Sequence, residues 1–120
     1  MFGHDDWDGV RHEDTIVYAK ALELMSTTRE ASSQFPNGFG LVADPLRRST
    51  SSVCRNFAEG YYYDSKPQQR RYFGYAIPSA RESSASFDTA WSFRLCRQQT
   101  IDPGKPLALD IVKMRSKWGR

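Results

Sequence analysis

The apolar positions in the first third of the chain recur with the spacing of an α-helix. Between residues 17 and 35 they step by three or four, which places them on one side of a helix. Asp14 is a suitable N-terminal cap, and the segment 35–40, with one proline and two glycines, ends the pattern. We therefore predict a helix over about residues 14–34. Its apolar stripe consists of Val17, Ala21, Leu24, Thr28, Ala31 and Phe35.

The same spacing predicts a second helix that ends near Ala58. Gly60 follows it and is suited to a left-handed C-terminal cap. Because proline lacks the backbone N–H, Pro45 leaves two alternatives: the helix begins at Asp44, or it begins near Leu41 and bends at the proline. Its apolar stripe consists of Leu46, Thr50, Val53 and Phe57.

A third helix is predicted from Ser65 onward, because Ser65 and Gln68 have the spacing of a capping box. The apolar pattern continues for roughly 30 residues, or about 45 Å of helix. Pro78 lies inside it and is expected to bend it. The segment 61–63, three consecutive tyrosines, is predicted to be a loop between the second and third helices. The stripe of the third helix consists of Phe73, Ala76, Ala80, Ser84, Phe87, Trp91 and Leu95.

A short fourth helix is predicted after the Pro- and Gly-containing segment 102–106. The fold class is therefore all-α, and four helices with short connections pack most simply as an antiparallel up-and-down bundle with a long third helix. We assign residues 14–120 to this bundle and residues 1–13 to a flexible acidic N-terminal arm. The stripe of the fourth helix consists of Leu107, Ile111, Met114 and Trp118.

Charge is distributed unevenly along the chain. The formal net charge is +3, but residues 1–40 hold three basic and seven acidic side chains, whereas residues 41–120 hold fourteen and seven. Twelve of the seventeen cations are arginine, whose planar guanidinium suits phosphate and carboxylate oxygens. This favours an anionic partner for the second part of the chain. The alternative is that the arginines keep the helices soluble and bridge subunits.

The residues that carry most enzyme and metal chemistry are sparse. The two histidines, His4 and His12, both precede the predicted bundle, so Cys54 and Cys96 lack an activating base. Two cysteines 42 positions apart are expected to be buried thiols rather than a disulfide framework or a zinc cage. No apolar run is long enough to span a membrane. We expect a cytoplasmic protein with no enzymatic activity, metal, cofactor, membrane or small-molecule substrate.

A candidate nucleic-acid site comes from arginines and tyrosines that we expect to gather at one end of the bundle. Phosphates would pair with the cations, and unpaired bases would stack on the rings. The alternative is that Arg48 and Arg55 pair with Glu59, Glu82 or Asp88 and that the tyrosines pack at an interface. The candidate residues are Arg47, Arg48, Arg55, Arg70, Arg71 and Tyr62.

Three segments resemble one known family: FPNGFGL (35–41), LRRSTSSVCRNFAEG (46–60) and YFGYAIPSARE (72–82). They are similar to the four-helix bundle proteins encoded in intervening sequences of bacterial large-subunit ribosomal RNA genes. The resemblance covers about residues 14–95. Pro45 stands where that family usually has Gln and Pro78 where it has Gly, and the last helix is short and polar. The matching positions are Phe35, Pro36, Gly40, Leu41, Leu46, Arg47, Arg48, Ser52, Asn56, Ala58, Glu59, Gly60, Ala76, Ser79 and Glu82.

The resemblance implies a bundle that assembles into a ring, a homopentamer, without enzymatic activity. It also implies structural roles for Gly60 as a cap and for Asn56 and Glu59 as hydrogen-bonding groups between helices or subunits. Our hypothesis is a non-enzymatic, oligomeric bundle that binds RNA or DNA phosphates through its arginines. The alternative is a protein–protein scaffold or assembly subunit with no nucleic-acid partner. The structural motif residues are Phe35, Pro36, Leu46, Asn56, Glu59 and Gly60.

Overall fold

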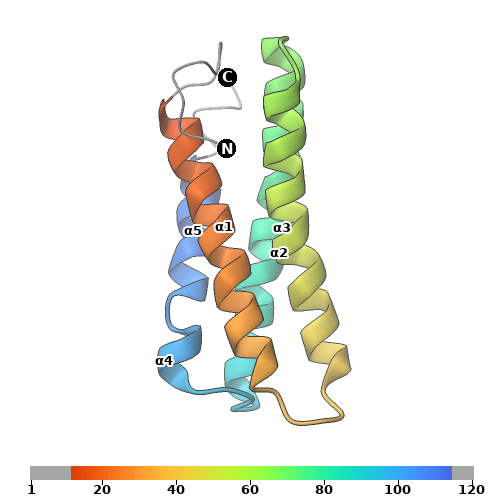
Figure 1. Cartoon of the computed structure of the whole chain (residues 1–120), viewed down its shortest axis with the longest axis vertical. Helices are drawn as coiled ribbons and strands as arrows, with labels where there is room; N and C mark the ends of the chain where they lie inside the picture. The colour runs from red at the N-terminus through yellow and green to blue at the C-terminus, as the bar shows by residue number, and fades with distance from the viewer. Residues whose placement is uncertain (1–11, 115–120) are drawn as a thin grey trace.

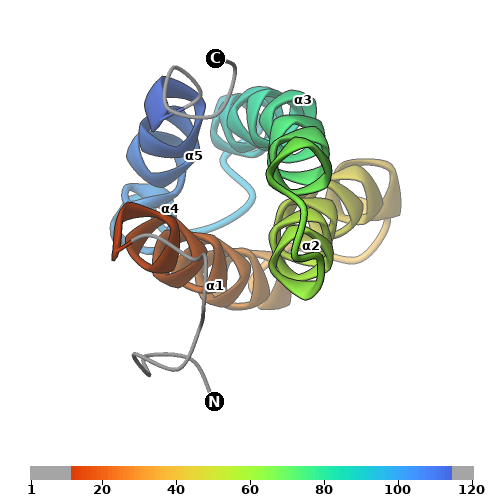
Figure 2. The same cartoon turned by 90° about the horizontal axis from the view of Figure 1, so that it is seen from above.

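Four antiparallel helical segments, which we call legs, surround one apolar core; α4 and α5 together form the fourth leg. The computed structural model describes residues 12–114. Viewed from above, the legs occupy four corners, and each packs against its two neighbours: α1 against α2, α2 against α3, α3 against α5, and α5 against α1 (Figures 1 and 2). This confirms the predicted all-α four-helix bundle. The helices are α1 (His12–Ser33), α2 (Gly40–Tyr62), α3 (Lys66–Ser92), the single turn α4 (Gln98–Ile101) and α5 (Gly104–Lys113).

The core is built from the apolar stripes that the spacing predicted. Val17, Ala21 and Leu24 of α1 are fully buried, and so are Leu46, Val53 and Phe57 of α2. The third helix and α5 add large side chains such as Phe87 and Ile111. Burying a side chain of this size stabilises the fold by about 1.5–3 kcal/mol. The helical period therefore determines which face of each leg is turned inward.

The structure corrects one predicted helix start and decides between the two alternatives for another. The first helix begins at His12, so Asp14 lies inside it and is not its cap. The second begins at Gly40 with Pro45 inside it, which agrees with the alternative of a start near Leu41 and rules out a start at Asp44. The missing N–H of Pro45 leaves the carbonyl of Leu41 without its usual partner within the helix. Leu41 is 92% exposed, so water can bind that carbonyl and offset the loss.

The third and fourth legs follow the prediction more closely. Ser65 caps α3, because its side chain accepts a hydrogen bond from the backbone N–H of Gln68 over 3.5 Å. The third helix is the longest, with 27 residues, and it continues through Pro78. The fourth leg is divided into α4, which the pattern did not predict, and α5. Trp118 and residues 1–11 of the predicted arm lie outside the described residues.

Gly60 is not a left-handed cap. The second helix continues to Tyr62, and Gly60 is buried inside it against the ring of Phe73. A Cβ at position 60 would lie 2.6 Å from Cδ1 of Phe73, closer than real Cβ atoms approach a carbon. Glycine is needed here because it has no side chain, so the Phe73 ring on α3 can pack directly against the backbone of α2. Positive φ angles occur instead at Gly38 (96°) and Arg94 (54°), in the two loops at the other end of the bundle.

Small polar residues also bring α2 and α3 together farther along their contact. The hydroxyl of Ser83 lies 3.0 Å from that of Ser49, and the hydroxyl of Ser79 lies 2.8 Å from that of Ser52. Ser49 and Ser83 are almost completely buried. The serine-rich segment 49–52 of α2 is therefore a close packing surface against α3. Within the described residues, no helix is long and apolar enough to cross a membrane.

Candidate nucleic-acid interface

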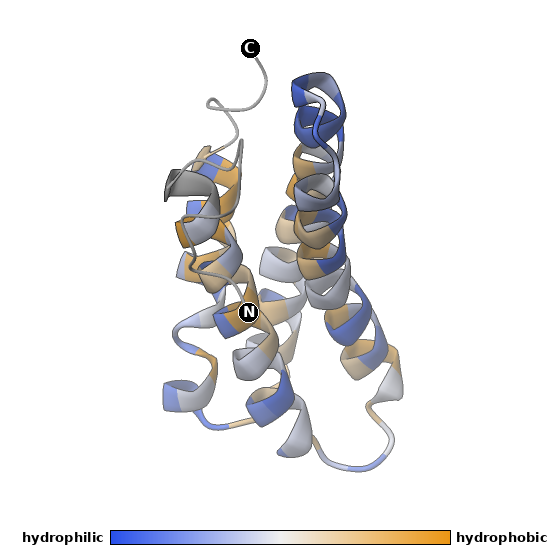
Figure 3. Cartoon of the chain, turned by 45° about the horizontal axis from the view of Figure 1, so that its top comes forward, coloured by the Kyte–Doolittle hydropathy of each residue, from blue (hydrophilic) through white to orange (hydrophobic). Residues whose placement is uncertain are grey.

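The helices α2 and α3 form a hairpin whose connecting end extends beyond the neighbouring legs (Figures 1 and 3). We call residues 51–75 the tip and residues 40–50 with 76–92 the base. The tip holds four basic and two acidic side chains, whereas the base holds three of each. Most of the tip is coloured as hydrophilic in Figure 3. The excess positive charge of the hairpin therefore lies in its tip.

Two of the three arginines of the base, Arg47 and Arg48, each have a carboxylate partner, whereas the exposed Arg81 has none among the described residues. The guanidinium of Arg48 lies 2.5 Å from a carboxylate oxygen of Glu82 on α3. That of Arg47 lies 3.7 Å from Asp44, one turn earlier on α2. Arg47 also lines a cavity of about 380 Å³ between α1 and α2, together with Arg29 and several hydroxyl groups. The adjacent arginines thus point toward different neighbouring helices, and the predicted pairing of Arg48 with Glu82 is confirmed.

The arginines of the tip are in a different environment. Among the described residues, no carboxylate lies within ion-pair distance of Arg55, Arg70 or Arg71, although all three are exposed. Arg55 therefore does not form the alternative pairs that its sequence position allowed. Because an exposed guanidinium is always charged, these three side chains are available to an anionic partner.

Arg71 is held in place by aromatic groups instead. Its Nε donates a hydrogen bond to the hydroxyl of Tyr75 over 2.7 Å. Its guanidinium lies over the rings of Tyr72 and Tyr75, at 5.8 and 5.7 Å from their centroids. The hydrogen bond to Tyr75 raises the pKa of Arg71 above its usual value. A cation over aromatic faces keeps its charge while losing conformational freedom, which prepares it to contact a phosphate.

Four tyrosine rings cross the tip from α2 to α3, and we call them the tyrosine row: Tyr62, Tyr63, Tyr72 and Tyr75. The ring of Tyr62 meets Tyr63 edge to face at 6.2 Å, Tyr63 stacks nearly parallel on Tyr72 at 5.2 Å, and Tyr72 meets Tyr75 edge to face at 5.6 Å. A hydrogen bond with Tyr72 raises the pKa of Tyr63. The rings are thus a continuous set of contacts rather than separate side chains.

The predicted tyrosine loop is wrong in one respect. Tyr61 and Tyr62 belong to α2, and Tyr61 is half-buried, packing edge to face on Tyr18 and Phe73 at 5.6 and 5.1 Å. Tyr61 therefore belongs to the core, whereas Tyr62 is 84% exposed. Tyr72 and Tyr75 were not selected from the sequence. Their spacing of three, directly after Arg70 and Arg71, is the signal that places them on the same side of α3.

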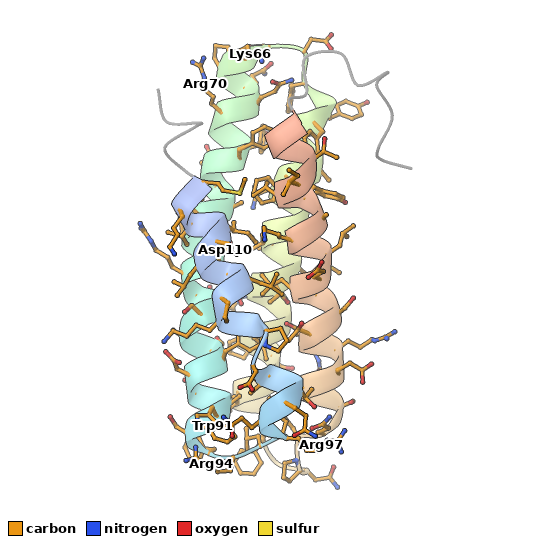
Figure 4. The ribbon with its side chains drawn as sticks, turned by 90° about the vertical axis from the view of Figure 1, so that its left-hand side faces the viewer. Lys66, Arg70, Trp91, Arg94, Arg97 and Asp110 are labelled. Atoms are coloured by element: carbon orange, nitrogen blue, oxygen red, sulfur yellow. The ribbon has the colours of Figure 1, made fainter. Side chains whose placement is uncertain are left out.

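The candidate residues do not all gather at one end of the bundle, and that expectation is wrong for Arg47 and Arg48. Tyr62 lies fourteen positions after Arg48, which in a helix is about 21 Å. Only Arg70, Arg71 and Tyr62 lie at the end of the hairpin, with Arg55 about two turns below them. Figure 4 places Lys66 and Arg70 at this end and Trp91, Arg94 and Arg97 at the opposite end of the molecule.

The structural motif residues have more local roles than expected. Leu46 is fully buried, Phe35 packs against the core, and Pro36 is exposed in the loop after α1. Asn56 donates to the carbonyl and the hydroxyl of Ser52, at 2.9 and 3.2 Å, so its hydrogen bonds lie within α2. It reaches α3 only through the contact of Ser52 with Ser79. This corrects the expected direct bond between helices.

Glu59 differs from Asn56 in that it has no hydrogen bond or ion pair within the described residues. It is exposed on α2, one turn after Arg55. A hydrogen bond to a neighbouring helix of the same chain is therefore not its role. That Glu59 forms a hydrogen bond to a second subunit stays a prediction.

Among the described residues, no hydrogen bond or ion pair activates either thiol. Burial raises the pKa of Cys54 to about 11 and, to a smaller extent, that of the half-buried Cys96. Both are unpaired, and the expectation of buried thiols is right for Cys54 and wrong for Cys96, which is half-buried. A thiol whose pKa is raised is a poor nucleophile. Within residues 12–114, no group of three or more His, Cys, Asp or Glu side chains is placed to hold a metal ion. His4 lies outside the described residues.

These features define a class of protein: an all-α, four-helix bundle whose central hairpin carries an arginine- and tyrosine-rich tip. The profile of one family, described as 23S rRNA-intervening sequence protein, matches residues 13–117. The chain belongs to this family, and the resemblance that its three motifs indicated is confirmed. No curated protein matches the chain.

Proposed function

We propose that the protein is a non-enzymatic, oligomeric bundle that binds RNA or DNA through the tip of its α2–α3 hairpin. The observation that carries this proposal is the set of exposed tip arginines that have no carboxylate partner among the described residues, Arg55, Arg70 and Arg71, in the same tip that carries the exposed ring of Tyr62. The excess of basic residues in positions 41–120 supports the same conclusion. A nucleic acid offers both groups that such a surface can bind, the phosphates and the base faces.

Each arginine has a distinct expected part in this binding. Arg55 and Arg70 pair with phosphates, and Arg71 does so from the position in which Tyr75 holds it. Arg48 contributes less, because its charge is already balanced by Glu82. Breaking an exposed ion pair of this kind costs only about 0–1 kcal/mol. We therefore expect the base to bind nucleic acid more weakly than the tip, rather than not at all.

A salt titration with paired variants tests the proposal. Binding to a labelled structured RNA and to duplex DNA is measured for the unmodified protein, for Arg55→Glu with Arg70→Glu, and for Arg47→Glu with Arg48→Glu as the matched control. Each phosphate contact contributes about −0.9 to the slope of log K against log salt on duplex DNA. We expect the tip variant to lose most of its affinity and about two units of slope, and the base variant to lose much less.

Two results would contradict the proposal. One is the absence of binding at low salt by a folded, intact protein, which would favour the scaffold alternative. The other is an equal loss of affinity in both variants, which would mean that general charge rather than the tip decides binding. Circular dichroism of each variant shows that the bundle is still folded.

The oligomeric part of the proposal is supported by apolar side chains at the opposite end of the hairpin. Leu41 is 92% and Phe93 62% exposed, and the ring of Phe93 lies 6.1 Å from that of Phe39. Exposed apolar clusters of this kind commonly pack against another protein surface. We propose that they contribute to contacts between subunits of a ring, with the homopentamer as the expected form.

Light scattering tests this oligomeric proposal. The unmodified protein should have the mass of a closed oligomer, and Leu41→Lys with Phe93→Lys should reduce it while leaving the helical content unchanged. A protein that is monomeric at micromolar concentration contradicts the ring. If the protein is oligomeric but binds no nucleic acid, the same apolar surface supports the alternative function, a protein–protein scaffold.

A further inference from the structure

The tyrosine row suggests which form of nucleic acid the tip binds. We propose that the tip binds unpaired nucleotides in preference to a duplex, stacking one base on Tyr62 and one on Tyr75. This inference rests on the proposed nucleic-acid function and goes beyond it, because phosphate contacts alone do not distinguish single strands from duplexes.

The exposure of the rings shows where bases can bind. Tyr63 and Tyr72 form the inner, parallel pair of the row and are half-buried. Tyr62 and Tyr75 occupy the two ends, and they are 84% and 47% exposed. Each outer ring meets its inner neighbour edge to face, at interplanar angles of 82° and 87°. Part of each outer ring's surface therefore remains open to solvent, which is what a stacking base needs.

The outer ring of Tyr75 is also held in place before any ligand binds. The hydroxyl of Tyr75 accepts the hydrogen bond from Arg71, whose guanidinium lies over the same ring. Tyr62 contacts Tyr63, which is itself stacked on α3 through Tyr72. Side chains that are already ordered lose little entropy on binding, so more of the stacking energy appears as affinity.

The charges near the row fit a strand whose bases are turned toward the protein. Arg71 stands next to the Tyr75 end of the row, and Arg70 is its neighbour in sequence near the end of the hairpin (Figure 4). Phosphates that link two stacked nucleotides can therefore pair with these arginines. In a duplex the base faces are covered by neighbouring base pairs, so the rings would contribute nothing.

Fluorescence anisotropy with three labelled probes of equal length tests the inference: oligo-uridine, oligo-thymidine and a DNA duplex, all at the same salt concentration. The key variant is Tyr62→Ala, and the matched control is Tyr62→Phe, which keeps the ring. We expect Tyr62→Ala to weaken single-strand binding by roughly 5- to 150-fold, the range for losing one stacked base. Duplex binding should change less than twofold, and Tyr62→Phe should bind single strands almost as the unmodified protein does.

A second variant covers the other end of the row. Tyr75→Ala removes both the outer ring and the hydrogen-bond acceptor of Arg71, so it should weaken single-strand binding at least as much as Tyr62→Ala. Tyr75→Phe keeps the ring and loses only the hydroxyl. It should retain most of the single-strand affinity if stacking dominates.

The possible outcomes separate this inference from the function on which it rests. Equal affinity for single strands and duplex, with Tyr62→Ala unchanged, overturns stacking while the arginine-dependent function stands. If no probe is bound at low salt, the proposed function itself fails. If Tyr62→Ala lowers the oligomer mass in light scattering, the row is a contact between subunits and the inference is wrong.

Discussion

The two halves of the α2–α3 hairpin use similar residues in opposite ways. In the base, Arg48 pairs with Glu82 across the two helices, and the hydroxyl of Ser83 on α3 contacts that of Ser49 on α2. In the tip, the arginines have no carboxylate partner among the described residues, and aromatic rings cross from one helix to the other. The base therefore has no net charge and pairs two of its three arginines within the chain, whereas the tip keeps two net positive charges and its exposed rings for a partner.

The halves also differ in how the helix backbones approach one another. In the tip, the glycine at position 60 admits the ring of Phe73. In the base, small hydroxyl side chains at Ser49 and Ser83 fill the contact and hydrogen-bond to each other. The first arrangement depends on the absence of a side chain and the second on a polar pair. Substitutions should therefore affect the two halves by different mechanisms and to different extents.

The largest effect is expected from Gly60→Ala. The added methyl group overlaps the Phe73 ring, and overpacking of this kind costs about 1–3 kcal/mol. The gain in helix propensity of up to about 1 kcal/mol offsets only part of that cost. Urea unfolding should show a net loss of stability.

Gly74→Ala is the matched control in the same half of the hairpin. Its Cβ would meet nothing within 4 Å, so the alanine should stabilise α3 by about 0.5–1 kcal/mol. If both alanine variants are equally stable, the close approach at Gly60 does not hold the tip together.

A smaller effect is expected from Ser83→Ala in the base. The substitution removes the hydroxyl that bonds to Ser49 and leaves a buried oxygen with one partner fewer, which costs about 1 kcal/mol. The double variant with Ser49→Ala should be less destabilised than the sum of the two single variants, because both partners are then removed. Additive losses in urea unfolding would show that the two hydroxyls act independently.

The smallest effect is expected from the ion pair of the base. Arg48 and Glu82 are 64% and 44% exposed in their side chains, so a double-mutant cycle with alanine should give a coupling energy of about 0.2–1 kcal/mol that declines with added salt. Coupling above this range would mean that the pair fixes the hairpin rather than merely balancing its charge. No measurable coupling would leave Arg48 as available to an anion as the tip arginines.

The sequence by itself determined the bundle. The steps of three and four place Val17, Leu46 and Phe87 on inward faces, because a helix repeats every 3.6 residues whatever its neighbours are. The cap at Ser65 and the family could also be read from local residue patterns. Candidate chemistry was predicted less completely: Arg70, Arg71 and Tyr62 were selected, but Tyr72 and Tyr75 were not.

Only the tertiary structure decided which of these residues act together. That Gly60 admits Phe73, that Arg48 meets Glu82 and that Tyr63 stacks on Tyr72 all depend on the register between α2 and α3. The helical period of one segment says which face is buried but not which residue of another helix lies opposite it. That register is set by the packing of the whole core, and it separates the balanced base from the tip whose arginines and tyrosines remain available.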